Sequence, residues 1–154
     1  MLSLTVLMVS DVKETTAIAN ELRPVLLRLA RELRREIHSL GVTGGQVSLM
    51  AAIKHEPGIT ASVLAERERV SAPAISNHLA RLEAARLVAR TRGDADRRRV
   101  GLALTSEGEK VLRSVRQRRT AWLSRRLEQL TDDERAAIDA AVEPLAKLLE
   151  ADAE

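Results

Sequence analysis

The sequence of 154 residues has no cysteine, no phenylalanine and no tyrosine, and Trp122 is its single tryptophan. Without thiols the chain cannot form disulfides, thiolate zinc clusters or iron–sulfur sites, and no cysteine can act as a nucleophile or redox sensor. Modules that bind single-stranded nucleic acid stack the bases on aromatic side chains. The scarcity of aromatic residues therefore argues against that class of ligand.

Motifs of enzymes and metal sites are also missing. The sequence contains no phosphate-binding glycine loop, no nucleophile elbow and no dinucleotide-binding fingerprint. Its three histidines, His38, His55 and His78, lie in separate segments without the spacing of metal ligands. We therefore expect no enzymatic activity, no catalytic residues, no cofactor and no metal. No apolar run is long enough to span a bilayer, so we expect a cytoplasmic protein without membrane contacts.

What the sequence does contain is a globular composition with an uneven distribution of charge. Hydrophobic residues make up 45% of the chain and charged residues 31%, which is the balance of a folded domain. Seven arginines and three acidic residues lie between Ser71 and Thr105, whereas Glu128–Glu154 holds nine acidic and two basic residues. A basic centre next to an acidic end predicts a nucleic-acid face beside a separate module that does not bind nucleic acid.

The N-terminal part of the chain predicts a long helix. Apolar residues recur at steps of three and four between Lys13 and Leu40, the pattern of an amphipathic helix, and Pro24 either bends this helix or marks its start. We interpret residues 1–12 as a loose N-terminal extension, or as the product of a start codon placed upstream of Met8.

Capping residues mark the next three helices. Thr43–Gln46 has the T-x-x-Q pattern of a capping box and predicts a helix that ends at Pro57. Thr60 begins a short helix, and Ser71 is the expected N-cap of a fourth helix that runs to about Ala85. The apolar residues that this fourth helix should bury are Ile75, Leu79 and Leu82. Its outward stripe is small, polar and basic, and comprises Pro73, Ser76, Asn77, Ala80 and Arg81.

A hairpin and two further helices complete the chain. Val88–Arg92 and Val100–Leu104 are the expected strands, and the residues between them form a long, charged tip. Ser106–Glu109 and Thr131–Glu134 are the expected capping boxes of the last two helices. This order of elements predicts a winged helix-turn-helix in a mainly α (α+β) fold.

Double-stranded DNA is the ligand that fits this arrangement. A major groove about 12 Å wide admits one helix if the side chains of its first turns are short. Asn77 can form a bidentate pair with adenine, and Ala72 or Pro73 can contact a thymine methyl group. An arginine of the hairpin tip can enter the flanking minor groove, and Asp96 is placed to orient Arg98. The candidate DNA contacts are Ala72, Pro73, Ser76, Asn77, Arg81, Asp96, Arg97 and Arg98.

From Thr16 to Leu149 the chain resembles the MarR family of bacterial transcription regulators. The most specific part is a D-x-R wing with a trailing L-T-x-x-G. The matching segments are Leu64-Ala65, Ser71–Leu82, Leu82-Glu83-x-x-x-Leu87-Val88-x-Arg90, Asp96-Arg97-Arg98 and Leu104-Thr105-x-x-Gly108. The resemblance implies a sequence-specific DNA-binding regulator, a repressor, in which Arg98 contacts the minor groove and Asp96 orients it.

The sequence departs from the family pattern at two positions. Asn77 stands where many members have an arginine that contacts a base or a phosphate. Arg86 stands where glycine is common, and a left-handed helix cap at this residue would strain its Cβ atom. Two interpretations of Arg86 stay open: the helix ends differently, or the side chain reaches a phosphate.

The resemblance further implies a homodimer that binds a pseudo-palindromic operator and is released by a small-molecule effector. Residues 13–154 would then form one MarR-like domain, with a winged-helix lobe at 43–105 and dimerisation helices at 13–40 and 106–150. The leucine-rich stripes of these helices support the dimer, because the lobe alone cannot cover them. The alternative from another class is a dimeric helical interaction module, an anti-regulator, that does not bind DNA.

Arg98→Ala should weaken binding to duplex DNA by about 1–3 kcal/mol and leave the melting temperature nearly unchanged, because an exposed wing tip contributes little to folding. Asp96→Ala should act in the same direction, but more mildly. Titration of a labelled duplex and thermal denaturation of each variant measure the two effects. Equal affinity of the wild type and Arg98→Ala would remove the wing from the mechanism.

Overall fold

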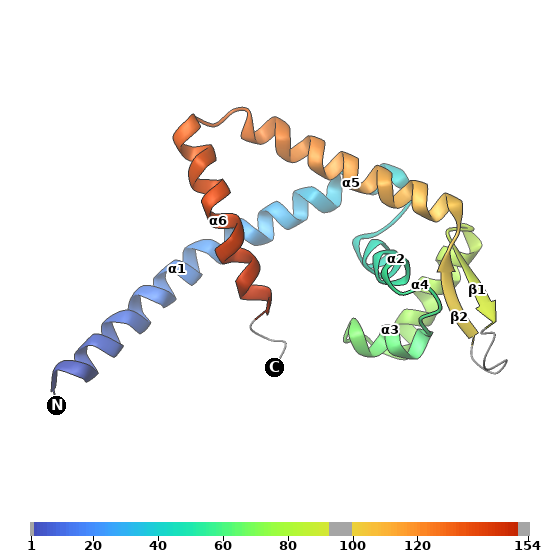
Figure 1. The fold of residues 1–154 in the computed structure, drawn as a ribbon, viewed down its shortest axis with the longest axis horizontal. Coiled ribbons are helices and arrows are strands. Elements are labelled where there is room, and N and C mark those ends of the chain that lie inside the picture. Colours follow the sequence, from blue (N-terminus) through green and yellow to red (C-terminus); the bar gives the residue numbers. More distant parts are fainter. Residues whose placement is uncertain (1, 93–99, 151–154) are drawn as a thin grey trace.

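The computed structural model describes residues 2–92 and 100–150, with side chains for residues 13–91 and 100–149. The described chain is mainly helical and has one antiparallel hairpin (Figure 1). In chain order its elements are α1 (Leu2–Arg35), the short 3-10 helix η1 (His38–Leu40), α2 (Gly44–His55), α3 (Ala61–Arg67), α4 (Ala72–Ala84), β1 (Val88–Arg92), β2 (Val100–Leu104), α5 (Ser106–Leu127) and α6 (Asp132–Glu150). The predicted fold class is confirmed.

The helices of the central lobe begin at the predicted caps. At the start of α2, the Gln46 amide donates to Thr43 Oγ1 (3.3 Å) and the Thr43 amide donates to Gln46 Oε1 (2.9 Å), so the capping box is present. Thr60 and Ser71 cap α3 and α4 through their side-chain oxygens. Each such cap satisfies a backbone amide that the helix leaves without a partner, which stabilises the fold by about 1 kcal/mol.

The first helix differs from the prediction at both ends. It begins at Leu2, so residues 2–12, expected as a loose extension, are helical, and Pro24 lies inside the helix. It ends at Arg35, and the chain continues through η1 to Gly41, whose φ of 71° is left-handed. Apolar spacing alone could not separate this 3-10 turn from a continuing helix, because a segment of three residues is too short to reveal its different period.

The expected capping box at Ser106–Glu109 is wrong. Thr105 is the N-cap of α5, and its Oγ1 accepts the Gly108 amide (3.0 Å). The second expected box, at the start of α6, is confirmed: the Thr131 amide donates to Glu134 Oε2 (2.9 Å) and the Glu134 amide donates to Thr131 Oγ1 (3.3 Å). Hydrogen bonds from the Thr131 amide and hydroxyl lower the pKa of the Glu134 carboxyl.

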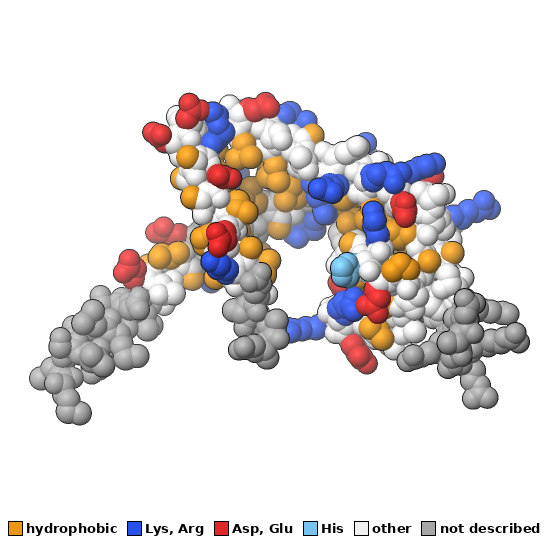
Figure 2. Space-filling view, viewed as in Figure 1, with side chains coloured by type: hydrophobic (Ala, Val, Ile, Leu, Met, Phe, Trp, Pro, Cys, Tyr) orange, Lys and Arg blue, Asp and Glu red, His pale blue; other side chains and the backbone are white. Residues whose placement is uncertain are grey.

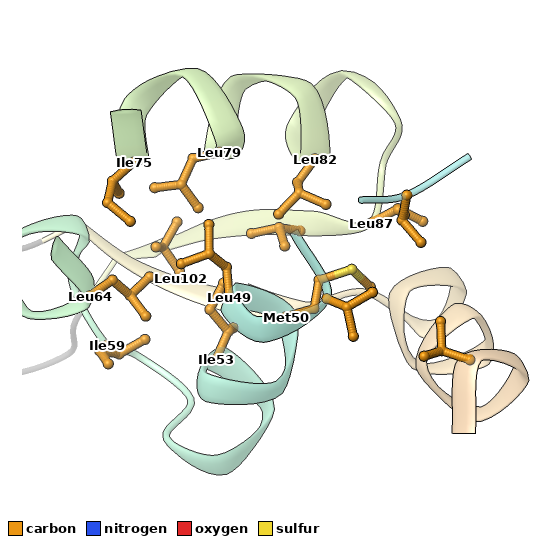
Figure 3. Close-up of a cluster of buried hydrophobic side chains, with 14 of the residues drawn as sticks. Leu49, Met50, Ile53, Ile59, Leu64, Ile75, Leu79, Leu82, Leu87 and Leu102 are labelled. Carbon is orange, nitrogen blue, oxygen red and sulfur yellow. The ribbon is translucent and has the colours of Figure 1, made fainter. Parts of the chain in front are cut away.

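The hydrophobic core lies in the lobe formed by α2, α3, α4 and the hairpin, together with the start of α5 (Figure 3). Three residues of α4, Ile75, Leu79 and Leu82, are at most 1% exposed and point into this core, as predicted. They meet buried residues of α2, including Met50 and Ile53. Burial of each such side chain stabilises the lobe by about 1.5–3 kcal/mol. The core thus fixes which face of α4 points outward.

The end of α4 is fastened to the start of α5. The Leu87 amide donates to the Leu82 carbonyl and the Arg86 amide donates to the Glu83 carbonyl, both at 2.9 Å, which is a Schellman cap. Arg86 occupies its left-handed position with φ 57°, so the interpretation that the helix ends differently is wrong. Thr105 Oγ1 lies 2.7 Å from the Arg86 carbonyl, to which it can donate, and the Thr105 amide donates to the Leu87 carbonyl (3.1 Å).

Outside the lobe the helices are largely exposed. In Figure 1, α1 and α5 extend away from the lobe and α6 folds back from the end of α5 across α1. Every described side chain of α6 except those of Ala141 and Leu145 is exposed, including Ile138 and Val142. Among the described residues, no helix combines the length and apolar character needed to cross a membrane.

Gly108→Ala should destabilise the fold by roughly 1–3 kcal/mol or more, because a Cβ atom at this position would overlap with the backbone carbonyl of Leu87. The matched control is Gly45→Ala in α2, where a Cβ atom would meet only the His78 ring at 3.8 Å. That change should be neutral or stabilise by up to about 1 kcal/mol, because alanine favours helix. Urea denaturation of both variants tests the comparison, and equal stabilities would contradict it.

Candidate nucleic-acid interface

The outward face of α4 is the candidate interface. Ile75, Leu79 and Leu82 anchor the inner face, and the helical period then places the predicted contact residues together on the opposite side. All five of those that belong to this helix are exposed, namely Ala72, Pro73, Ser76, Asn77 and Arg81. The structure therefore brings the α4 part of the predicted site together on one surface.

The first two turns of this face are short and uncharged. Ser71 Oγ accepts the Ala74 amide (3.4 Å), and Pro73 stands in the first turn, where it costs no internal hydrogen bond. From Ala72 to Leu79 there is no Lys, Arg, Asp or Glu. A surface of this kind can approach the edges of base pairs closely, because no long side chain holds the helix away.

Arg81 is the basic residue of the outward stripe, one turn beyond Asn77. It is exposed, and within residues 13–91 and 100–149 no acidic side chain pairs with it. Arg90, in contrast, forms an ion pair: its Nε donates to Glu83 Oε1 (2.9 Å), which links the end of α4 to β1. This difference leaves Arg81 available for a phosphate.

The helix-turn-helix is braced by polar contacts of α3 with α2 and the turn after it. Arg67 Nη2 lies 2.7 Å from Glu56 Oε2, and Ser48 Oγ donates to Glu68 Oε2 (2.8 Å). Both contacts are exposed, so each contributes little to stability. They link the end of α3 to α2, next to the turn at Arg69, whose φ is 52°.

The hairpin has the predicted strands in register from Val88 opposite Leu104 to Arg92 opposite Val100. The turn after α2 is hydrogen-bonded to β2, because the Gly58 amide donates to the Leu102 carbonyl (2.8 Å) and the Leu102 amide donates to the Ile59 carbonyl (3.0 Å). Gly101 permits this approach, since a Cβ atom there would lie 2.7 Å from the Gly58 carbonyl oxygen. The wing is thereby fixed to the lobe.

Three predicted site residues, Asp96, Arg97 and Arg98, lie outside the described residues. The chain leaves β1 at Arg92 and enters β2 at Val100, which is the end of the hairpin opposite Leu87 and Thr105. Strands of five residues, each rising about 3.3 Å, put the base and the tip of the hairpin more than 10 Å apart.

The sequence did not predict a hollow of about 910 Å³ between α1, α5 and α6. Its walls are mostly apolar, and Arg28, Glu32 and Arg126 add charge. Trp122 lines it with only 7% of its surface exposed, and the Arg126 guanidinium lies 5.0 Å from the ring centroid. The spacing of Trp122 and Arg126, four residues apart on one helix face, was the available signal.

No group of three or more potential metal ligands is found in the residues that the structure describes. His38, His55 and His78 lie in η1, α2 and α4, as the sequence suggested for separate segments. His78 is half-buried, and its ring lies beside Gly45 at the start of α2, so it packs between two helices of the lobe.

Known proteins resemble this chain in sequence and in fold. The sequence model of the MarR family matches residues 40–99. The HTH-type transcriptional repressor MdtR of Bacillus subtilis is 33% identical over 113 residues, which is 73% of this chain and 73% of MdtR. The crystal structure of the YusO protein from Bacillus subtilis has a TM-score of 0.71 at 30% identity and covers 88% of this chain and 96% of its own.

A third similar structure contains nucleic acid. It is the F27L mutant of MepR from S. aureus, described as bound to an oligodeoxyribonucleotide. The TM-score is 0.65 at 21% identity, with 85% of this chain and 96% of that chain covered. At this identity the likeness shows a shared fold.

Proposed function

The chain belongs to the MarR family of DNA-binding transcription regulators, and on this premise we propose that it is a repressor that binds a pseudo-palindromic operator as a homodimer. The observation that carries the proposal is the short, uncharged outward face of α4, held on a rigid lobe beside the wing. The repressor role is supported by the name of MdtR, and the DNA partner by the oligodeoxyribonucleotide of the MepR structure. The proposal includes a cytoplasmic location, because the proposed partner is DNA.

Within this proposal each predicted side chain has a role. Asn77 reads a base in the major groove, while Ala72, Pro73 and Ser76 allow the helix to approach the bases. Arg81 lies one turn further along α4 and binds a phosphate. At the wing, Arg98 enters the minor groove and Asp96 orients the Arg98 side chain, while Arg97 adds positive charge next to the DNA backbone.

The homodimer is supported by apolar surface that the chain itself does not cover. Exposed fractions reach 59% at Ile18 and Leu27 in α1, and 60% at Val142 and 84% at Leu149 in α6. A soluble protein rarely leaves helical stripes of this kind in water. We therefore assign residues 13–40 and 106–150 to dimerisation and residues 43–105 to DNA binding.

Charge on these helices complements the apolar stripes. Helix α6 carries six acidic and two basic residues, whereas α5 carries seven basic and two acidic residues. Figure 2 shows acidic side chains along α6, basic side chains along α5, and hydrophobic side chains exposed between them. A second chain that packs its α6 against α5 of the first would bury the exposed apolar side chains and pair acidic with basic residues.

A small-molecule effector completes the proposal. The hollow between α1, α5 and α6 offers apolar walls with two arginines, Arg28 and Arg126, against one acidic residue, Glu32, so its net positive charge suits an apolar anion. It is formed by the helices assigned to dimerisation. A ligand there would change how these helices pack, and through α5 the position of α4.

The dimeric complex is tested by sedimentation with duplex DNA selected from a random pool. We expect two chains per duplex and half-sites about 34–36 Å apart, since two α4 helices must enter successive major grooves on one side of the DNA. Affinity should fall at least tenfold between low and moderate salt, because several phosphates are contacted. A tight complex of one chain on one half-site would refute the dimer, and the absence of salt-dependent binding would favour the protein-interaction module.

Asn77→Ala and Arg81→Ala should fail in different ways. Asn77→Ala should relax base preference at one position per half-site at a cost of about 1–3 kcal/mol, with little change in the salt dependence. Arg81→Ala should weaken binding to all sequences alike and reduce the slope of log K against log salt by about 1 per chain. Titrations of the selected and a scrambled duplex at several salt concentrations separate the two. The reverse pattern would exchange the two roles.

A further inference from the structure

Two arginines of the lobe adopt a backbone conformation that favours glycine. Arg69, in the turn between α3 and α4, has φ 52°, and Arg86, after α4, has φ 57°. Both occupy the same place in the same motif: after α3 the Val70 amide donates to the Ala65 carbonyl (3.1 Å) and the Arg69 amide to the Glu66 carbonyl (3.2 Å). The Cβ atom of each arginine is strained there, and glycine would not be.

Nothing in the described chain compensates the strain at Arg69. Its neighbours are engaged, since Arg67 pairs with Glu56 and Glu68 accepts the Ser48 hydroxyl. Arg69 itself is exposed, and its guanidinium has no hydrogen bond or ion pair with the residues described. Because the strained backbone at Arg69 is not accompanied by a side-chain contact with the described residues, we look for a contact of this side chain with a ligand.

The position of Arg69 points to the backbone of the bound DNA. It precedes the N-cap Ser71 by two residues and so lies at the end of α4 that carries Ala72 and Pro73. The first two turns of α4 supply no charged residue of their own. Arg69 is therefore the nearest cation to that end of the helix along the chain.

Arg86 lies at the C-terminal end of α4, whereas Arg69 precedes its N-terminal end. The Arg86 carbonyl lies 2.7 Å from Thr105 Oγ1 at the start of α5, at the base of the hairpin. Helix α4 has 13 residues, so about 20 Å of helix separate the two arginines. Arg86 is also exposed, and no ion pair of the described side chains involves it. The two residues thus match in type, backbone conformation and solvent exposure, and differ in place.

We propose that Arg69 is a phosphate anchor for the recognition helix and that Arg86 is not, against the remaining interpretation of its sequence, by which the Arg86 side chain reaches a phosphate. The proposal rests on the proposed function, because it concerns the same DNA complex. A guanidinium fits a phosphate with two parallel hydrogen bonds, and a phosphate contact at this end of α4 fixes how deeply its first turns enter the groove. The contact is independent of sequence, so Arg69 sets position while α4 reads bases.

The test compares Arg69→Gly with Arg86→Gly. Both changes relieve the same backbone strain, so both should raise the thermal midpoint by roughly 1–4 °C. Only Arg69→Gly should lose DNA affinity, by roughly 60-fold at 0.1 M salt for a dimer that gives up two phosphates, with the slope of log K against log salt about 2 lower in magnitude. Arg69→Lys should retain most of the affinity and slope, because it keeps the charge. The probes are the selected duplex and its scrambled counterpart, on which the loss should be equal.

The outcomes are distinct. If Arg69→Gly binds DNA with the slope and affinity of Arg86→Gly, the proposed anchor is refuted while the proposed function stands. If the wild type shows no salt-dependent binding to either duplex, the proposed function is refuted together with the anchor. A loss of affinity confined to the selected duplex would also overturn the proposal, because it would make Arg69 a reader of sequence.

Discussion

The contact between the end of α4 and the start of α5 is the constraint on which the rest of the structure depends. The Thr105 amide donates to the Leu87 carbonyl, and Thr105 Oγ1 contacts the Arg86 carbonyl and accepts the Gly108 amide. A Cβ atom at Gly108 has no room beside the Leu87 carbonyl. Because β1 starts at Val88 and β2 ends at Leu104, the base of the wing is fixed by the same few atoms. The recognition helix, the wing and the long arm helix therefore cannot move independently at this point.

This contact separates the lobe, whose apolar side chains are buried, from helices whose apolar side chains are exposed. The lobe buries its apolar side chains, with Met50, Ile53 and Leu64 fully inaccessible to solvent. The helices outside the lobe, α1, α5 and α6, which we call the arm helices, leave apolar side chains exposed, such as Val142 and Leu149. A change in how the arm helices pack on a partner would alter the position of α4, because α5 is one continuous helix from Trp122 back to its contact with the end of α4. The effector proposed above would act in this way, because a ligand that alters the packing of α1, α5 and α6 would act on α4 through α5.

Sequence patterns were reliable where the structure is governed by local physics. The capping boxes at Thr43 and Thr131, the inward face of α4 and both strands follow from spacing of a few residues, and the structure agrees with them. The N-cap at Thr105 was missed because Ser106 offers a similar local pattern one residue later, and the contacts that distinguish Thr105, with the carbonyls of Arg86 and Leu87, join residues 19 and 18 apart in sequence. The hollow beside Trp122 was missed for the same reason, since three helices far apart in the chain form it. Local pattern cannot report a contact whose partners only the fold brings together.

The arginines of the lobe illustrate the same distinction. The sequence alone does not distinguish them, but the structure divides them by what their side chains contact. Arg67 and Arg90 are occupied by Glu56 and Glu83 and brace the scaffold, whereas Arg69 and Arg81 leave their guanidinium groups in solvent. In the proposed complex the uncharged turns of α4 discriminate between bases and the unpaired arginines beside them supply attraction to phosphate. Affinity and specificity then reside in different side chains, so a change in operator sequence requires new residues on one face of α4 and leaves the electrostatic contribution intact.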